Sequence, residues 1–132
     1  MKTVSSILFF SFIVLTLTSC TKESFDQKIV GKWQISEVSG FNGTNYYSTT
    51  VPEASRSLIE VFDNGGFVET MPASWGGTSC TGTYSILKEN QAQFRSNCSG
   101  PDNVSFNISK KTLIRTKAGR DDMVTEKFIK IQ

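Results

Sequence analysis

Beyond about residue 28, apolar and polar residues alternate along the chain in short runs separated by Gly, Asn and Asp clusters. Alternation with a period of two is typical of half-buried strands, and these clusters favour turns. No segment shows helical periodicity over a useful length. The pattern predicts eight strands, at residues 29–38, 57–62, 66–70, 80–87, 91–98, 104–108, 112–116 and 123–131. The fold class is therefore all-β, either a sandwich or an antiparallel up-and-down barrel.

The lengths of the connections favour the barrel. Long connections at residues 39–55, 71–79, 99–103 and 117–122 alternate with tight turns at 63–65, 88–90 and 110–111. In an up-and-down barrel alternate connections lie at the same end, so the long loops form a mouth and the tight turns a closed end. Trp33, on the first strand, enters at the closed end. The aromatic residues predicted to frame the mouth are Phe41, Tyr46, Tyr47 and Trp75.

Residues 80–98 read as one hairpin with its turn at residues 88–90, which sets Leu87 opposite Gln91. The same register pairs Ile86 with Ala92, Tyr84 with Phe94, Gly82 with Ser96, and Cys80 with Cys98. Opposed residues have Cβ atoms about 4.5–5.5 Å apart, and a disulfide needs about 3.5–4.5 Å, so a small adjustment closes the bridge. The hairpin therefore predicts a Cys80–Cys98 disulfide, formed in an oxidising compartment.

The first twenty residues indicate export. Lys2 precedes an apolar run at residues 7–15, which is too short to span a membrane and fits a secretory signal peptide. The segment Leu17-Thr18-Ser19-Cys20 resembles the lipobox of bacterial lipoproteins. That resemblance implies a signal peptide at 1–19 and a tether at 20–28 lipidated on Cys20, and the strand pattern then places the barrel domain at 29–132. An ordinary signal peptide with an incidental Cys is the alternative.

The residues after Cys20 bear on the destination of the protein. Thr21, rather than Asp, follows Cys20. By analogy with lipoprotein sorting, this favours the outer membrane of the cell envelope over retention at the inner one. Lys22-Glu23 and Asp26 resemble the acidic tags of surface-exposed lipoproteins in Bacteroidetes-like bacteria. The lipid on Cys20 would make the membrane a partner. The sequence leaves open whether the protein lies on the periplasmic or on the outer face of that membrane.

The start of the barrel domain carries a family resemblance. Gly31-Lys32-Trp33 matches the Gly-x-Trp signature of lipocalins and opens an eight-strand meander. The chain from about residue 29 to 131 thus resembles the lipocalin-like domain of bacterial lipoproteins, in a minimal version without the long basic motif and flanking helix of larger lipocalins. A second resemblance, to META/HslJ-like lipoprotein domains, rests on Cys80-Thr81-Gly82 followed by Cys98, at a shorter spacing than that family has.

Charge and composition exclude several functions. The chain has 14 Lys and Arg against 12 Asp and Glu, and no basic run exceeds Lys110-Lys111, which argues against a nucleic-acid partner. It has no His, the commonest general base and metal ligand. We therefore expect no catalysis, no metal and no cofactor.

The lipocalin resemblance implies a small apolar ligand at the mouth or in the interior of the barrel. Candidate contacts are Phe41, Tyr46, Tyr47 and Trp75 at the mouth, with Tyr84 and Phe94 inside. The mouth aromatics could equally be loop residues packed onto the barrel. Inside, the aromatic side chains either line a cavity or fill it, since eight strands enclose little more than side chains; these are Phe62, Tyr84, Phe94, Phe106 and Phe128. The alternative function is a protein-binding envelope module, such as an enzyme inhibitor, of unknown oligomeric state.

The lipobox resemblance gives a direct test. We expect Cys20→Ser to prevent lipid attachment, because the thiol that accepts the lipid is lost, and to leave an unprocessed or soluble product. Membrane fractionation and gel migration measure this. A variant that fractionates and migrates like the wild type would show that Cys20 is not lipidated.

Overall fold

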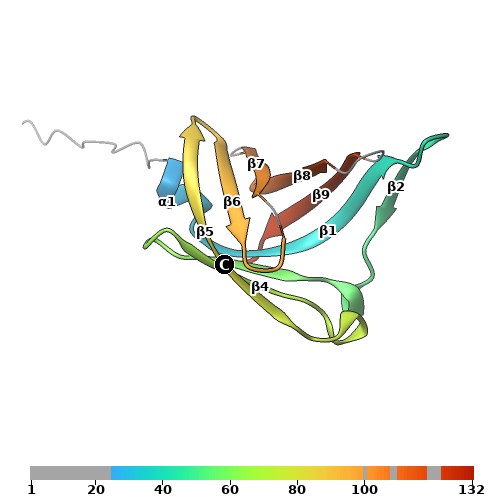
Figure 1. Ribbon diagram of the computed structural model, residues 1–132, viewed down its shortest axis with the longest axis horizontal. Coiled ribbons are helices and arrows are strands. Elements are labelled where there is room, and N and C mark those ends of the chain that lie inside the picture. Colours follow the sequence, from blue (N-terminus) through green and yellow to red (C-terminus); the bar gives the residue numbers. More distant parts are fainter. Residues whose placement is uncertain (1–24, 100, 108–109, 119–122) are drawn as a thin grey trace, which may run out of the picture.

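The computed structural model describes residues 25–99, 101–107, 110–118 and 123–132 (Figure 1). The predicted signal peptide and Cys20 lie outside the described residues. The elements are α1 (Phe25–Ile29), β1 (Gly31–Phe41), β2 (Tyr46–Thr50), η1 (Glu53–Ser55), β3 (Leu58–Val61), β4 (Gly66–Thr70), η2 (Ala73–Trp75), β5 (Ser79–Lys88), β6 (Gln91–Ser96), β7 (Pro101–Asn107), β8 (Thr112–Ala118) and β9 (Met123–Lys130). Among these residues, no helix has the length and apolar content needed to cross a membrane.

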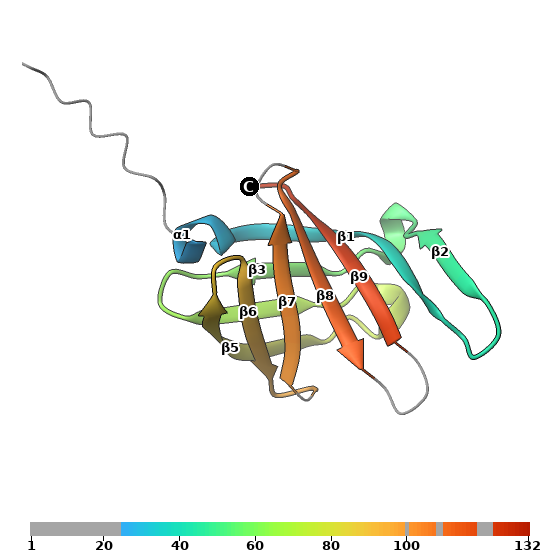
Figure 2. The same cartoon turned by 90° about the horizontal axis from the view of Figure 1, so that it is seen from above.

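Eight of the strands form a closed barrel. β1 and β3 to β9 pair antiparallel in sequence order, and β1 also pairs with β9. In Figure 2, β1, β3 and β4 run across β6 to β9, so the cylinder is flattened into two crossing faces. The predicted all-β, eight-stranded up-and-down barrel is confirmed, and the sandwich alternative is wrong, because each barrel strand has a neighbour on both sides.

The central hairpin has the predicted register except at its turn. Tyr84 pairs with Phe94 and Ile86 with Ala92, but Lys88 rather than Leu87 pairs with Gln91. Two-residue turns with positive φ match the twist of a hairpin, and Asn90 has φ 61°. The tighter turn leaves one extra residue on β5, which a bulge between Ile86 and Lys88 absorbs without turning the inward face outward.

The predicted disulfide is confirmed. Cys80 and Cys98 are joined with an S–S distance of 2.07 Å and a Cα–Cα distance of 5.7 Å. In the chain-entropy description, closing a loop of this length stabilises the fold by about 3 kcal/mol. The bridge fixes β5 to the end of β6 next to the connection between β4 and β5.

The prediction of one long loop at residues 39–55 is wrong for residues 39–41 and 46–50, which form strands. β1 continues to Phe41, and the chain returns as β2, which pairs with residues 37–41 of β1. The Asn42 side chain accepts hydrogen bonds from the N–H groups of Thr44 and Asn45 (3.1 and 2.8 Å), which stabilises the turn. The segment lacks apolar alternation, but its Tyr and Thr residues favour strands. Phe41, Tyr46 and Tyr47 therefore lie on strands.

Other boundaries shift by a few residues. β7 begins at Pro101, so Asp102, which we predicted in a turn, belongs to a strand and lies opposite Phe94. The last residues of the predicted tether and the first of the predicted barrel domain form the short helix α1. Ile29 at its end is fully buried in the barrel core rather than starting the first strand.

The closed end is packed around the Gly-x-Trp segment. Trp33 is fully buried, and its Nε1 donates a hydrogen bond to the carbonyl oxygen of Ile29 (2.8 Å). Gly31 has φ 133°, and a Cβ there would collide with the carbonyl oxygen of Gln132. The glycine thus lets the end of the chain cross the start of β1. The apolar core is Ile29, Trp33, Ile35, Val51, Ile59, Val61, Phe67, Ala92, Phe94, Val104, Leu113 and Phe128.

The two tryptophans should separate the core from the surface. Trp33→Ala removes a fully buried indole, so we expect it to lower the free energy of unfolding by about 3–5 kcal/mol. Trp75→Ala is the matched control, because Trp75 is 56% exposed on η2 and its loss should leave folding intact. Thermal melting of both variants measures the difference. A lower melting temperature for Trp75→Ala than for Trp33→Ala would contradict this assignment of the core.

Candidate functional site

The closed half of the barrel interior is filled by side chains. Trp33, Leu113 and Phe128 have exposed fractions of 0%, and Phe94 has 2%. A side chain next to a water-sized hollow would expose part of its surface to that hollow, so none adjoins these residues. The sequence left open whether the inward side chains line a cavity or fill the barrel. At this level, the side chains described here fill it.

The predicted interior ligand residues accordingly belong to the packed wall. Phe94 stacks on Phe67 and Tyr84, with ring centroids 4.7 and 5.9 Å away. The Tyr84 hydroxyl donates a hydrogen bond to the carbonyl oxygen of Phe62 at the turn between β3 and β4 (2.9 Å), and the Phe62 side chain is exposed. Phe62 therefore does not line the interior. The Phe106 side chain lies outside the described residues.

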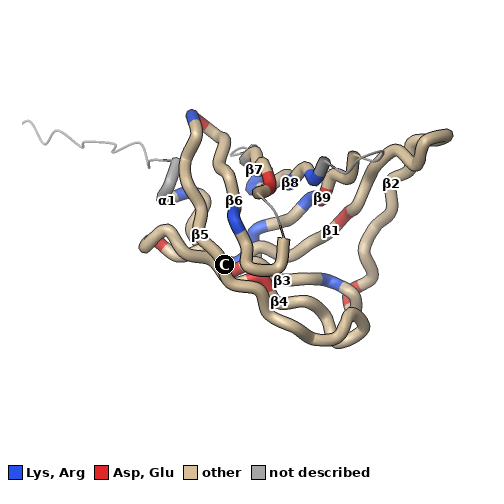
Figure 3. The backbone as a smooth tube through the Cα atoms, in the orientation of Figure 1, with Lys and Arg blue, Asp and Glu red and all other residues tan. Residues whose placement is uncertain are grey.

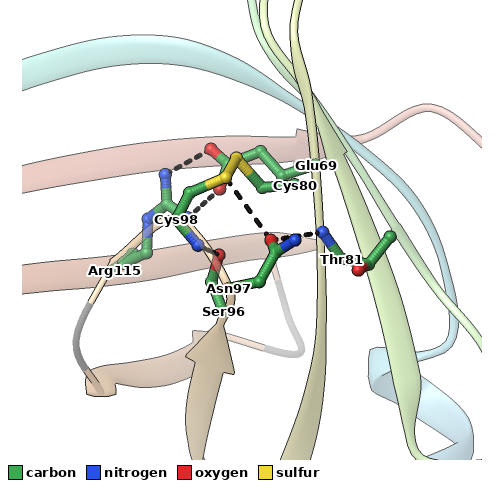
Figure 4. The surroundings of a disulfide bond; sticks show 7 residues. All are labelled: Glu69, Cys80, Thr81, Ser96, Asn97, Cys98 and Arg115. Carbon is green, nitrogen blue, oxygen red and sulfur yellow. Dashed lines mark hydrogen bonds and ion pairs between the residues drawn. A yellow bond between two sulfur atoms is a disulfide. The ribbon is translucent and has the colours of Figure 1, made fainter.

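The mouth side of the interior is crossed by an ion pair between β8 and β4. Arg115 donates from Nη1 and Nη2 to both carboxylate oxygens of Glu69 (2.8 and 2.6 Å) and from Nε to Glu126 on β9 (2.6 Å). Arg115 is 3% exposed and Glu69 5%. Figure 4 shows the pair beside the Cys80–Cys98 disulfide. An apolar ligand cannot occupy this level of the barrel without displacing buried charges.

The ion pair extends to further charged side chains. Lys117 adds a second cation, with its Nζ 3.2 Å from Glu126, so two basic side chains meet two carboxylates. Burial alone would lower the pKa of Arg115, but hydrogen bonds and charges from Glu69 and Glu126 outweigh it and hold that pKa above its usual value. The guanidinium also lies over the Phe128 ring, 5.1 Å from its centroid.

Asp102 faces the same cluster from β7. Burial raises the pKa of its carboxyl, and the positive charges of Arg115 and Lys117 act in the opposite direction. Because the pKa is raised on folding, the ionised form costs stability as the pH rises through the folded value. Sequence reasoning missed this cluster. Strand parity could have found it, since Glu69 follows the inward Phe67 by two positions and Arg115 follows the inward Leu113.

Three of the predicted mouth residues come together beside β1. An open groove of about 410 Å³ lies at the hairpin of β1 and β2 and the start of β9. Phe41 and Tyr46 pack with ring centroids 4.9 Å apart. Tyr47 lies across Gly40, where a Cβ would come within 2.8 Å of the tyrosine hydroxyl. The residues that line the groove are Ser39, Gly40, Phe41, Tyr46, Tyr47, Ser48, Met123 and Thr125.

The fourth predicted mouth residue lies apart from this groove. Trp75 is on η2, which contacts η1, and does not line the groove. A second open groove, of about 300 Å³, is lined by polar and apolar residues of β6 and β7 together with Leu87 and Thr116. The described part of the chain contains no group of three or more His, Cys, Asp or Glu side chains suited to hold a metal ion.

No protein-family model matches the chain, and no curated protein matches it. The likeness to lipocalins therefore rests on the closed eight-stranded antiparallel barrel, which is consistent with that fold. Such a barrel is compatible with ligand binding of the lipocalin kind.

The buried ion pair should be far more important for stability than an exposed one of the same type. Glu69→Gln removes one charge from the cluster around Arg115, and we expect it to lower the free energy of unfolding by about 3 kcal/mol, because a buried cation loses compensation. Glu60→Gln is the matched control on the neighbouring strand β3. Its ion pair with Lys32 is long (3.8 Å) and partly exposed, so its loss should cost less than about 1 kcal/mol.

The midpoint of urea denaturation measures both changes in the free energy of unfolding, provided that the m-value is the same for the two variants. Equal midpoints for the two variants would show that the ion pair inside the barrel contributes no more than a surface contact.

Proposed function

We propose that this protein is a non-catalytic, membrane-anchored binding protein whose groove between the β1–β2 hairpin and β9 takes a small apolar ligand. The observation that carries the proposal is this groove of about 410 Å³, in which Phe41, Tyr46 and Tyr47 meet Met123. Its volume lies within the range typical of small-molecule sites, about 300–1,000 Å³. Both Tyr47 and Met123 are exposed, so a ligand could cover them without displacing buried groups.

The chemistry of the lining supports an uncharged ligand. No charged residue occurs between Glu37 and Glu53, and the groove lining contains none. The aromatic rings and the methionine of the lining favour binding of a ligand that has flat rings or alkyl chains. The hydroxyls of Ser39, Ser48 and Thr125 add polar groups, although Ser48 already donates to Glu37. We infer a ligand with an apolar body and at most a few polar groups.

The filled interior also favours the groove over the lumen. Side chains pack the closed half, and the Glu69–Arg115 pair crosses the mouth side. A ligand that entered the lumen would have to separate this pair, which costs several kcal/mol. Binding at the rim has no such cost.

The anchor would set the direction in which the groove points. The chain enters the barrel at the closed end, where the carbonyl oxygen of Lys28 accepts a hydrogen bond from Lys130 and that of Ile29 accepts one from Trp33. Lipid on Cys20, eight residues before Lys28, would hold the closed end towards an outer membrane. The groove would then face away from the bilayer, open to solutes of the envelope or the surroundings.

A protein partner is the second candidate. Tyr46 is 84% exposed and Trp75 56%, both towards the mouth end. Large exposed aromatic side chains commonly anchor protein interfaces. A partner covering both residues would make this protein an envelope binding module, for example an inhibitor.

Titration with N-phenyl-1-naphthylamine, an uncharged apolar fluorophore, tests the groove. We expect saturable binding by the wild type and a weakening of about 1–3 kcal/mol in Tyr47→Ala, because a groove wall is lost. Ile131→Ala is the control, since this exposed apolar residue lies near the closed end. Thermal melting verifies that both variants fold.

Equal affinities of Tyr47→Ala and Ile131→Ala, or no saturable binding by the wild type, would refute the groove as an apolar site. If Trp75→Ala abolished capture of a purified protein partner while probe binding stayed intact, the second candidate would be favoured.

A further inference from the structure

β2 leaves one edge of the sheet open. It pairs with β1, and no described strand pairs with its other edge. All five of its side chains are exposed. In Figures 1 and 2 the β1–β2 hairpin projects beyond the barrel. The eight barrel strands have neighbours on both sides, so β2 differs from them in having backbone groups available for a further strand.

The backbone groups on this edge can be identified from the neighbouring hydrogen bonds. Val51 N–H donates to the carbonyl oxygen of Ser36, and the carbonyl oxygen of Asn45 accepts from Asn42 N–H. The backbone N–H and C=O groups of these odd-numbered residues therefore point towards β1. Because the direction of backbone groups alternates along a strand, the N–H and C=O groups of the even-numbered residues Tyr46, Ser48 and Thr50 point away from β1.

The features that normally protect an edge strand are missing from β2. Proteins blunt such edges with Lys, Pro, bulges or inward charges. β2 is Tyr-Tyr-Ser-Thr-Thr, has no charge or Pro, and pairs with β1 without a bulge. Figure 3 shows no charged residue on β2, while the nearest one on β1 is Glu37, opposite Thr50. Aromatic and β-branched residues also favour strand pairing. The edge is therefore suited to pair with another strand.

We propose that β2 pairs antiparallel with β2 of a second copy of this chain, about a two-fold axis at Ser48. In this register Ser48 faces Ser48 of the second copy, and Tyr46 faces Thr50 in both directions. All three pairs use the outward backbone groups and would form about six N–H···O bonds. On the other face Tyr47 opposes Thr49. Aromatic residues opposite β-branched ones are favourable cross-strand pairs.

The composition of β2 favours a second copy over an unrelated strand. Around a two-fold axis, the side chain at the centre meets its own copy, so a charge there would repel itself. Ser48 is small and uncharged, and its hydroxyl donates to the carboxylate of Glu37 on β1, so this charge lies on the side of β2 away from the axis. Glu37 is further compensated by Lys127 at 3.5 Å. Such an isologous contact closes on itself as a dimer. It uses backbone groups and does not depend on the proposed ligand site.

Cysteine cross-linking tests the register. Opposed residues of a hydrogen-bonded pair have Cα atoms about 5.5 Å apart, within the range of about 4.4–6.8 Å that a disulfide spans. We expect Ser48→Cys to form a disulfide-linked dimer on non-reducing gels. Thr50→Cys is the matched control on the same edge, because the two Thr50 positions would lie about 14 Å apart, four residues along the strand. The wild type shows how much disulfide-linked dimer forms through Cys20 alone, and thermal melting verifies that the variants fold.

A dimer band in Ser48→Cys that is absent from Thr50→Cys would support the pairing. Equal cross-linking of both variants, no cross-linking of either, or a product of another mass would overturn it.

A second test places a charge at the two-fold axis and measures the mass of the purified chain by light scattering. Ser48→Lys and Ser48→Glu should each lose the dimer, and an equimolar mixture should regain it, because opposite charges then meet. Thr44→Lys, in the hairpin turn, should keep the dimer. Dimers of both Ser48 variants alone, or a monomeric wild type, would refute the proposal.

Discussion

The pairing of β1 with β9 is the constraint on which the rest of the molecule depends. It joins the first and last barrel strands, with Trp33 opposite Lys130 and Ile35 opposite Phe128, and so turns an open sheet into a closed cylinder. The approach is close because Gly31 has no side chain where Gln132 passes. Closure removes both edges of the eight-stranded sheet and buries inward side chains, so a fully buried inward residue has to be either apolar or paired.

That requirement explains the two halves of the interior. Towards the closed end the inward residues are large and apolar, and they fill the narrow lumen. Towards the mouth the inward positions include Glu69 and Arg115, which are buried as a bidentate pair with Glu126 beside them. A buried charge without its partner would destabilise the barrel. At the levels formed by the described residues, the protein's own groups thus occupy the lumen, and the ligand site proposed above lies at the rim.

The rim owes its shape to the length of β1. Its first residues pair with β3, but beyond a bulge at Ser36 the strand continues past the end of β3 and pairs with β2 instead. This extension brings Phe41 and Tyr47 next to the start of β9 and also leaves the outer edge of β2 open. The proposed ligand groove and the proposed dimer contact are therefore two consequences of one long strand, one through its side chains and the other through backbone groups.

The sequence by itself determined the features that depend on neighbours along the chain. Alternation located the eight barrel strands, the 80–98 hairpin fixed the Tyr84–Phe94 pairing and the disulfide, and Gly31-Lys32-Trp33 indicated a packed closed end. Tertiary structure decided the rest. β2 has no apolar alternation, since neither of its faces is buried, and the partners in the Glu69–Arg115 pair are 46 residues apart, so their contact exists only once the barrel closes. Strand parity points such charges inward, but which charges meet is decided by the stagger of strands around the cylinder.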